Sequence, residues 1–351
     1  MESLSKDAIS LLKELISTPS ISREENKTAD IIQQHLQSRG VETNRILNNV
    51  WASNKHYDAS KLTILLNSHH DTVKPNAGYT NDPFTPITKD GILYGLGSND
   101  AGGCLVSLIA TFLYFYNKED LKYNIILAAT AEEEISGKNG IEKTIPELGK
   151  LNFAIVGEPT EMNVAISEKG LMVLDCTVTG KSGHAAREEG ENALYKAIKD
   201  IQWFKEYQFP KTSASLGKIK MSVTVIQSGT QHNVVPDTCT FVVDVRVTDS
   251  YSNTEVLKII KRHVSCDVQP RSTRLSSSGI DKDHPLIKAC INDGSSTYGS
   301  PTMSDQALLS IPSLKMGPGK SERSHTADEF IYLKEVEEGI QKYINRLNTI
   351  V

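Results

Sequence analysis

The sequence predicts an α/β protein with a mainly parallel sheet flanked by helices and a smaller domain inserted into the chain. Three observations lead to this prediction. Short apolar runs alternate with segments of helical periodicity in the first half, which is typical of parallel strands buried on both faces. Between residues 167 and 271 the strands instead alternate apolar and polar positions. The length of 351 residues suggests about two domains.

The first domain is predicted from the order of its helices and strands. Residues 7–17 and 26–39 have apolar positions at helical spacing, and Ser20 and Ser22 are possible caps of the second helix. Further elements are a helix from 101 to about 116 and buried strands at 62–67, 123–129 and 153–156. Strands that alternate with helices in this way indicate a parallel sheet with helices on both faces.

The inserted domain is predicted from a different pattern. Alternating strands are expected at 171–180, 218–227 and 238–247, a final strand near 264–268, and helices at 192–207 and 254–263. The order βαββαβ is that of the split ferredoxin-like arrangement, with one covered face of the sheet. We therefore assign 167–271 to the inserted domain, and 1–166 with 272–351 to the first domain, with a flexible crossing at 272–278.

Composition and charge exclude several classes of protein. The net charge of −5 leaves no basic footprint for nucleic acid. No apolar stretch approaches the length of a membrane span, and residues 1–7 contain acids rather than an apolar signal core. The five cysteines are odd in number, widely spaced and without a paired Cys-x-x-Cys motif. They are expected to be reduced, which predicts a cytoplasmic location. The charge and the lack of a long apolar stretch predict no nucleic-acid or membrane partner.

Polar side chains with metal-binding chemistry follow several strands and glycine-rich turns. They comprise two imidazoles and three carboxylates: His69, Asp100, Glu134, Glu158 and His325. Each alone is ambiguous, because a single histidine is more often structural and a run of glutamates is usually a solvated surface. Together they form a ligand set for two divalent ions at the carboxyl edge of the sheet, with Zn²⁺ the first choice and Co²⁺ an alternative.

Two neighbouring acids are candidates for supporting roles. In a strand, residues 69 and 71 point to the same side, so Asp71 is expected to accept the ring N–H of His69. His70 points away and is interpreted as a packing residue, although it is also the rival ligand. Glu133 is expected to remain free beside the ions and to move protons. The alternatives for Glu133 are a second ligand or a surface acid.

In combination, these motifs resemble the metal-dependent aminoacylase and carboxypeptidase family over nearly the whole chain. The resemblance implies a zinc-peptidase-like catalytic domain with an inserted dimerisation domain. It also implies that His69 and Glu158 bind one metal, that Glu134 and His325 bind the other, and that Asp100 bridges them. A cis peptide bond between Asp100 and Ala101 is expected on the same grounds.

The chain departs from the family pattern near two of these motifs. Where the family commonly has Gly-Arg-Gly and Asp-Met-Lys-Gly, this chain has Gly95-Leu96-Gly97 and an alanine and two glycines after Asp100. Glu132 replaces a common aspartate. These changes leave the predicted ligands in place but alter the local ion pairs that the resemblance implies.

The inserted domain carries two more stretches that match the family. Residues 180–186 contain His184, which by resemblance reaches into the partner subunit's site and stabilises an oxyanion. Asn233 and Arg246 would hold the substrate's α-carboxylate, for which a guanidinium is suited. The alternatives are a turn histidine at the interface for His184 and an ordinary strand residue for Arg246.

We therefore expect a cytoplasmic homodimeric two-metal hydrolase that cleaves the amide of a small N-acyl amino acid. The resemblance is nearest to the acetylornithine deacetylases of arginine biosynthesis, including variants that act on acetyl or succinyl forms of ornithine and citrulline. A succinyl-diaminopimelate desuccinylase and a metal-dependent dipeptidase are the alternatives within the family. A metal-binding scaffold without activity is disfavoured, because Glu133 and all five ligands are present.

Overall fold

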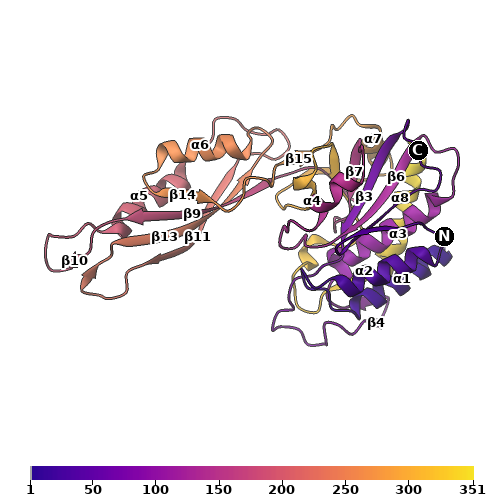
Figure 1. Ribbon diagram of the computed structural model, residues 1–351, viewed down its shortest axis with the longest axis horizontal. Coiled ribbons are helices and arrows are strands. Elements are labelled where there is room, and N and C mark those ends of the chain that lie inside the picture. The colour runs from indigo at the N-terminus through magenta and orange to yellow at the C-terminus, as the bar shows by residue number, and fades with distance from the viewer. Residues whose placement is uncertain (1) are drawn as a thin grey trace. The chain divides into compact units, whose positions relative to one another are not determined.

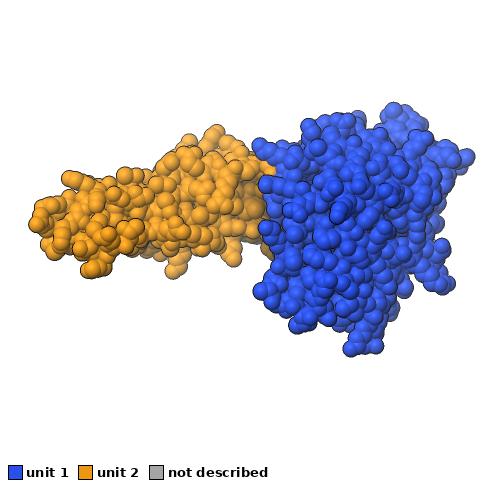
Figure 2. All heavy atoms as spheres, turned by 60° about the horizontal axis from the view of Figure 1, so that its bottom comes forward, with its two compact units in different colours: residues 1–166, 279–298, 304–351 blue, residues 167–278, 299–303 orange. Residues whose placement is uncertain are grey.

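The computed structural model describes residues 2–351, which divide into two compact units (Figures 1 and 2). Unit 1 contains the described residues up to Ile166, together with Gly279–Tyr298 and Ser304–Val351. Unit 2 contains Ser167–Ser278 and Gly299–Met303. The chain therefore leaves unit 1, builds unit 2 and returns, as the sequence predicts for an inserted domain.

Unit 1 is built on a mixed sheet whose centre is parallel. The four central strands are β6 (Tyr123–Thr130), β3 (Leu62–His69), β7 (Phe153–Val156) and β17 (Ser313–Lys315), in that order and all parallel. The remaining strands of this sheet are β1 (Asn44–Ile46), β2 (Asn49–Ser53), β8 (Val164–Glu168), β15 (Ser278–Gly279) and β16 (Thr297–Ser300). The predicted mainly parallel α/β architecture is confirmed.

Helices cover both faces of this sheet. Along β3, Ile64 and Leu66 point into the larger core while Leu65 points into a smaller core on the opposite face. The larger core is lined by α1 (Glu2–Ile16), α2 (Asn26–Gln37), α3 (Gly103–Tyr116), α7 (Pro285–Asn292) and α8 (Leu333–Asn348), and the smaller one by α4 (Ile141–Thr144) and η2 (Ile145–Glu147). Side chains on both faces of β3 are therefore shielded from water, which explains its continuous apolar run.

The start of α2 differs from the prediction. Its N-cap residue is Glu25, without a capping hydrogen bond from its side chain, and neither Ser20 nor Ser22 occupies that position. The Ser22 hydroxyl instead donates to Asp71 Oδ2 at 2.7 Å. A residue expected to cap the start of α2 thus contacts a carboxylate in the predicted site.

Unit 2 has the predicted βαββαβ order. Its elements are β9 (Gly170–Thr179), α5 (Ala193–Glu206), β11 (Lys220–Ser228), β13 (Thr238–Val247), α6 (Asn253–His263) and β14 (Asp267–Pro270). The sheet order is β11-β13-β9-β14, with antiparallel pairing throughout. Asn192 caps α5, and Ser252 with Glu255 forms a capping box on α6. The inserted ferredoxin-like fold is confirmed.

The second crossing lies later than the predicted boundary at 271–272, because residues 272–278 remain hydrogen-bonded to unit 2. Asn253 Nδ2 donates to the carbonyl oxygens of Thr273 and Leu275, and the N–H of Leu171 also donates to Leu275 O.

Among residues 2–351, no helix combines the length and apolar character that crossing a membrane requires.

Smaller elements complete the two units. They are the sheet of β4 (Ile87–Lys89), β5 (Ile92–Tyr94) and β18 (Phe330–Tyr332), the two-stranded sheet of β10 (Gly183–His184) and β12 (Val234–Val235), and the short helical turns η1 (Ser98–Gly102), η3 (Asp305–Leu308) and η4 (Ser321–Arg323). The turn η1 contains the predicted ligand Asp100, and η4 precedes the predicted ligand His325.

Candidate metal centre

The five predicted ligands all belong to unit 1, at one edge of its sheet. His69 is the last residue of β3, Glu134 follows the end of β6, and Glu158 follows the end of β7. Because these strands are parallel neighbours, their carboxyl ends meet at the same edge. Asp100 lies in η1, just before α3, and His325 lies in the loop after η4.

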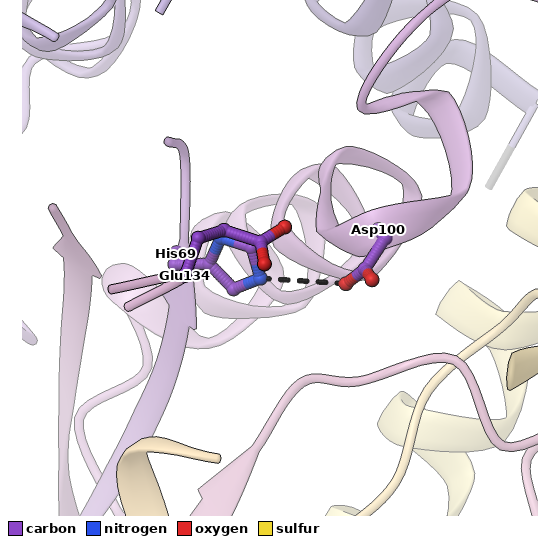
Figure 3. Close-up of side chains that lie close together, drawn as sticks. All are labelled: His69, Asp100 and Glu134. Carbon is purple, nitrogen blue, oxygen red and sulfur yellow. Dashed lines mark ion pairs between the residues drawn. The ribbon is translucent and has the colours of Figure 1, made fainter. Parts of the chain in front are cut away.

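The two imidazoles lie on either side of Asp100. His69 Nε2 is 3.5 Å from Asp100 Oδ1, the pair joined by the dashed line in Figure 3, and 3.9 Å from Glu158 Oε1. His325 Nε2 is 3.6 Å from Asp100 Oδ2 and 2.9 Å from Glu134 Oε2. Each oxygen of Asp100 thus faces a different histidine. Residues separated by as many as 256 positions in the chain are thus brought together at one edge of the sheet, and their assignment to two metals stays a prediction.

The donor atoms fit a divalent cation. His69 is 1% exposed, and its Nδ1 is 2.9 Å from the main-chain oxygen of Asp71. With the proton on Nδ1, Nε2 directs a lone pair at the acids, and it is a buried nitrogen without a hydrogen-bond partner. Ligand atoms around tetrahedral Zn²⁺ lie about 3.4 Å apart, close to the separations of 3.5 to 3.9 Å between His69 Nε2 and its acidic neighbours.

Two overlapping groups have ligand atoms within 4.8 Å of one another: His69, Asp100 and Glu134, and His69, Glu133 and Glu158. The second group includes Glu133, whose Oε2 is 3.9 Å from His69 Nε2. Distance therefore does not distinguish a ligand from a proton carrier at position 133. Both interpretations of Glu133 stay predictions.

The concentration of acids makes the site strongly favourable to cations. Burial and the charge of Asp100 raise the pKa of Glu158 to about 8. Burial also raises the pKa of Glu133 well above its usual range, with the neighbouring acids contributing. The hydrogen bond to Glu134 raises the pKa of His325 to about 9. Repulsion among the acids favours the neutral carboxyl of Glu158, whereas the neighbouring carboxylates favour the charged imidazolium of His325.

This charge pattern predicts that metal binding releases protons. At pH 7, Glu158 and His325 of the metal-free protein are mostly protonated, since their pKa values are about 8 and about 9. A cation must displace these protons, and the raised pKa values of Glu133 and His69 can add to them, so at least about two should be released per protein chain, and affinity should rise between about pH 6 and 9. Calorimetric titration with Zn²⁺ in buffers of different ionisation enthalpy measures this number. Equal heats in all buffers would contradict it.

Asp71 has a broader structural role than the sequence predicts. The nearest acceptor for His69 Nδ1 is the main-chain oxygen of Asp71, whereas the carboxylate Oδ1 is 3.4 Å away. The carboxylate accepts hydrogen bonds from the N–H groups of Glu133 and Glu134 at 3.0 and 3.2 Å. Asp71 therefore holds the loop of both glutamates as well as the histidine.

His70 makes contacts typical of a packing residue. Its Nδ1 is 2.8 Å from Thr28 Oγ1, and its Nε2 is 2.9 Å from Asn48 O. Burial lowers its pKa to about 4, which keeps the ring neutral. Both nitrogens already have partners, so the geometry favours packing over the rival interpretation as a ligand.

The loop of Gly317, Pro318 and Gly319 packs so closely against the site that side chains at its two glycine positions would clash with neighbouring atoms. Gly319 has a φ of 86°, and a side chain there would approach Asn99 Oδ1 to 2.4 Å. A Cβ at Gly317 would lie 2.7 Å from Glu158 O. The sequence predicts sharp turns here, and close backbone packing against two ligand-bearing loops is the additional reason for glycine.

Two buried acids beside the predicted ligands were assigned no role from the sequence. Asp305 is buried and accepts a hydrogen bond from Thr130 Oγ1 at 2.7 Å, at the end of β6. Glu329, four residues after His325, accepts hydrogen bonds from the η1 region. The expected cis bond between Asp100 and Ala101 is present.

The three predicted residues of unit 2 form two separate groups within that unit. His184 is exposed, pairs with Val234, and lies next to Asn233, whose carbonyl accepts the N–H of Ala185 at 3.0 Å. Arg246 lies near the other end of β13 and pairs with Asp244 at 2.9 and 3.0 Å. The eight residue steps from Thr238 to Arg246 span roughly 26 Å at about 3.3 Å per residue.

Comparison with known proteins links this geometry to one family. The sequence profile of peptidase family M20/M25/M40 matches residues 65–348. The chain is 26% identical to a succinyl-diaminopimelate desuccinylase of Ruegeria sp. (81% of this chain, 75% of the relative) and 26% identical to an acetylornithine deacetylase of Proteus mirabilis (94% and 93%). Its fold is similar to that of a dinuclear metal-binding M20 peptidase from Bacillus subtilis, with a TM-score of 0.77, 17% identity and coverage of 100% and 99%.

Proposed function

Because the chain belongs to peptidase family M20/M25/M40, and is therefore a metal-dependent amidohydrolase, we propose that it removes the acyl group from a small N-acyl amino acid. The observation that carries this proposal is the position of Asp100 between two imidazoles, with one oxygen toward each. Such a carboxylate is suited to bridging two cations. The dinuclear character of the Bacillus subtilis relative supports the same interpretation.

The site residues would have two kinds of role, metal binding and proton transfer. His69 and Glu158 would hold one ion, Glu134 and His325 the other, and Asp100 both. A pair of divalent ions, which we propose to be Zn²⁺ with Co²⁺ as a substitute, supplies Lewis acidity for the scissile carbonyl and for water. Glu133 Oε2 would accept a proton from the attacking water and return it to the leaving amine. Cations beside Glu133 favour its ionised form, so its pKa would fall when the site is filled.

For the substrate we propose an acetyl or succinyl derivative of ornithine or citrulline, which places the enzyme in arginine biosynthesis. The acetylornithine deacetylase of Proteus mirabilis, matched over most of both chains, supports this choice. The desuccinylase of Ruegeria sp. supports succinyl-diaminopimelate as the second candidate. A dipeptidase is the third, favoured only by the wider peptidase family. The five cysteines, all free and buried, agree with a reducing cytoplasmic location.

A substrate panel tests this proposal. The Zn²⁺- or Co²⁺-loaded protein is assayed with acetyl and succinyl forms of ornithine, citrulline and diaminopimelate, and with dipeptides. We expect the highest kcat/KM for an ornithine or citrulline derivative. A large preference for diaminopimelate derivatives or dipeptides would overturn the substrate assignment, and no turnover with any of them would count against an acyl amino acid hydrolase.

We also propose a homodimer in which His184 acts on the partner subunit's substrate. Exposed apolar side chains on α5 (Tyr195, Ile198) and on the edge strand β11 (Val225, Ile226) support an interface. The separation of His184 and Asn233 from Arg246 within unit 2 also supports it. If all three contact one substrate, the two groups are expected to come from different subunits.

Mixing two inactive variants tests His184 and the dimer together. His184→Ala should lower kcat by about 10² to 10³, the usual effect of losing one oxyanion donor. In a heterodimer with Glu133→Gln, one site regains an intact Glu133 and an intact partner histidine. After subunit exchange, activity should therefore return to about a quarter of the wild-type value. A mixture no more active than its components would contradict action across the interface.

A further inference from the structure

Glu329 is a buried acid whose contacts converge on the loop that carries Asp100. It is 1% exposed and comes just before β18. Its Oε1 accepts hydrogen bonds from the N–H groups of Asn99 and Asp100, both at 2.8 Å, and its Oε2 accepts one from Gly97 at 3.1 Å. The main-chain oxygen of Glu329 accepts a fourth from the N–H of Gly95 at 2.9 Å.

The three bonds to the side chain fix the Glu329 carboxyl group in one orientation. All three come from N–H groups, so both side-chain oxygens act as acceptors. A buried acid is costly unless such bonds compensate it. Because one donor is the N–H of Asp100 itself, a shift of Glu329 would move the backbone from which the Asp100 side chain projects.

The same segment of chain also holds the loop of His325. The Asn99 amide accepts from Lys320 N at 2.9 Å and donates to Lys320 O at 3.1 Å. Asn99 Nδ2 also lies 3.4 Å from Ser324 Oγ, next to His325. Glu329 therefore holds the backbone of Asn99, and the Asn99 side chain in turn joins the loop of Asp100 to the loop of His325.

We propose that Glu329 is a positioning residue that fixes Asp100 between His69 and His325, so that the centre binds its cations tightly. This inference rests on the proposed metal centre but not on the identity of the substrate. Partners of this kind, which orient a ligand without contacting the metal, typically change metal affinity by about 10- to 100-fold.

Glu329→Gln tests the proposal with a minimal change. The amide oxygen can keep the two bonds at Oε1, but the NH₂ group would face the N–H of Gly97, so a donor would oppose a donor. We expect the affinity for Zn²⁺, measured by competition with a chelator, to fall by about 10- to 100-fold. The visible absorption of the Co²⁺-loaded protein should also change, because the geometry around Asp100 changes.

Asp328→Asn is the matched control. Asp328 is the adjacent acid and also accepts main-chain N–H groups, from Thr80 at 2.9 Å and Asn81 at 3.2 Å, but it is only partly buried, and these bonds hold residues 80 and 81 rather than the η1 region. This variant should leave the metal affinity and the Co²⁺ spectrum unchanged. If Glu329→Gln lowers only the Tm of the metal-free protein, with affinity and spectrum as in the wild type, Glu329 is merely structural and the proposal is overturned.

Glu329→Asp is the second variant, in case the glutamine variant does not fold. It keeps the charge but is shorter by one methylene, so it pulls the η1 region or loses its bonds. We expect a reduced metal affinity and a smaller rise of Tm on addition of Zn²⁺ than in the wild type. Wild-type affinity in a folded Glu329→Asp, or failure of both variants to fold with Zn²⁺ present, would overturn the proposal. Activity is not needed as a readout, so a wrong substrate assignment would leave this test intact.

Discussion

Glu133→Gln is expected to lower kcat by a factor of about 10² to 10⁴, the usual contribution of a general acid–base group, without loss of bound metal. The amide has the shape of the carboxylate but cannot take up a proton from water. The Asp71 carboxylate holds the N–H of Glu133 at 3.0 Å, so the backbone should keep its place. Metal content by mass spectrometry and kcat under saturating substrate measure the two effects separately.

Two variants make this result interpretable. Glu134→Gln should lower metal content as well as kcat, because its carboxylate lies 2.9 Å from His325 Nε2 and is a predicted ligand. Glu147→Gln, an exposed acid in η2, should change neither. If Glu133→Gln also loses metal, Glu133 is a ligand, as its distance of 3.9 Å from His69 allows. Wild-type turnover would rule out the proton-carrier role.

His69→Asn is expected to remove bound metal and to lower activity by at least about 100-fold, because His69 belongs to both candidate ligand groups. The asparagine amide can still donate to the Asp71 carbonyl in place of Nδ1. It has no counterpart of Nε2, the nitrogen that faces the acids. Metal content and the rise of Tm on addition of Zn²⁺ should both decrease.

The adjacent histidine provides the control for this variant. His70→Asn should keep the metal content but lower the free energy of unfolding by about 1 to 3 kcal/mol, because the hydrogen bond to Asn48 O is lost in a buried site. Denaturant unfolding of the metal-free protein measures this difference. If His70→Asn loses metal and His69→Asn retains it, the assignment of the two histidines is reversed.

Local patterns determine most of the fold. The apolar runs of β3, β6 and β7 and the helical spacing of α1 and α2 are visible in any window of the sequence, since burial on two faces leaves a continuous apolar run. The alternation of β9 and β13 likewise reflects one covered face. The later domain crossing was not predictable, because it depends on hydrogen bonds from Asn253 to residues 20 and 22 positions away.

The sequence by itself determined the sheet, the inserted βαββαβ unit and the residue types of the candidate centre, because these follow from periodicity and from the chemistry of each side chain. Only the tertiary structure decided which atoms meet. It placed Asp100 between two histidines, gave the Asp71 carboxylate to the glutamate loop, and brought Glu329 beneath Asp100. The physical reason is that such contacts join segments far apart in the chain, and hydrogen-bond geometry depends on distances that no local pattern encodes.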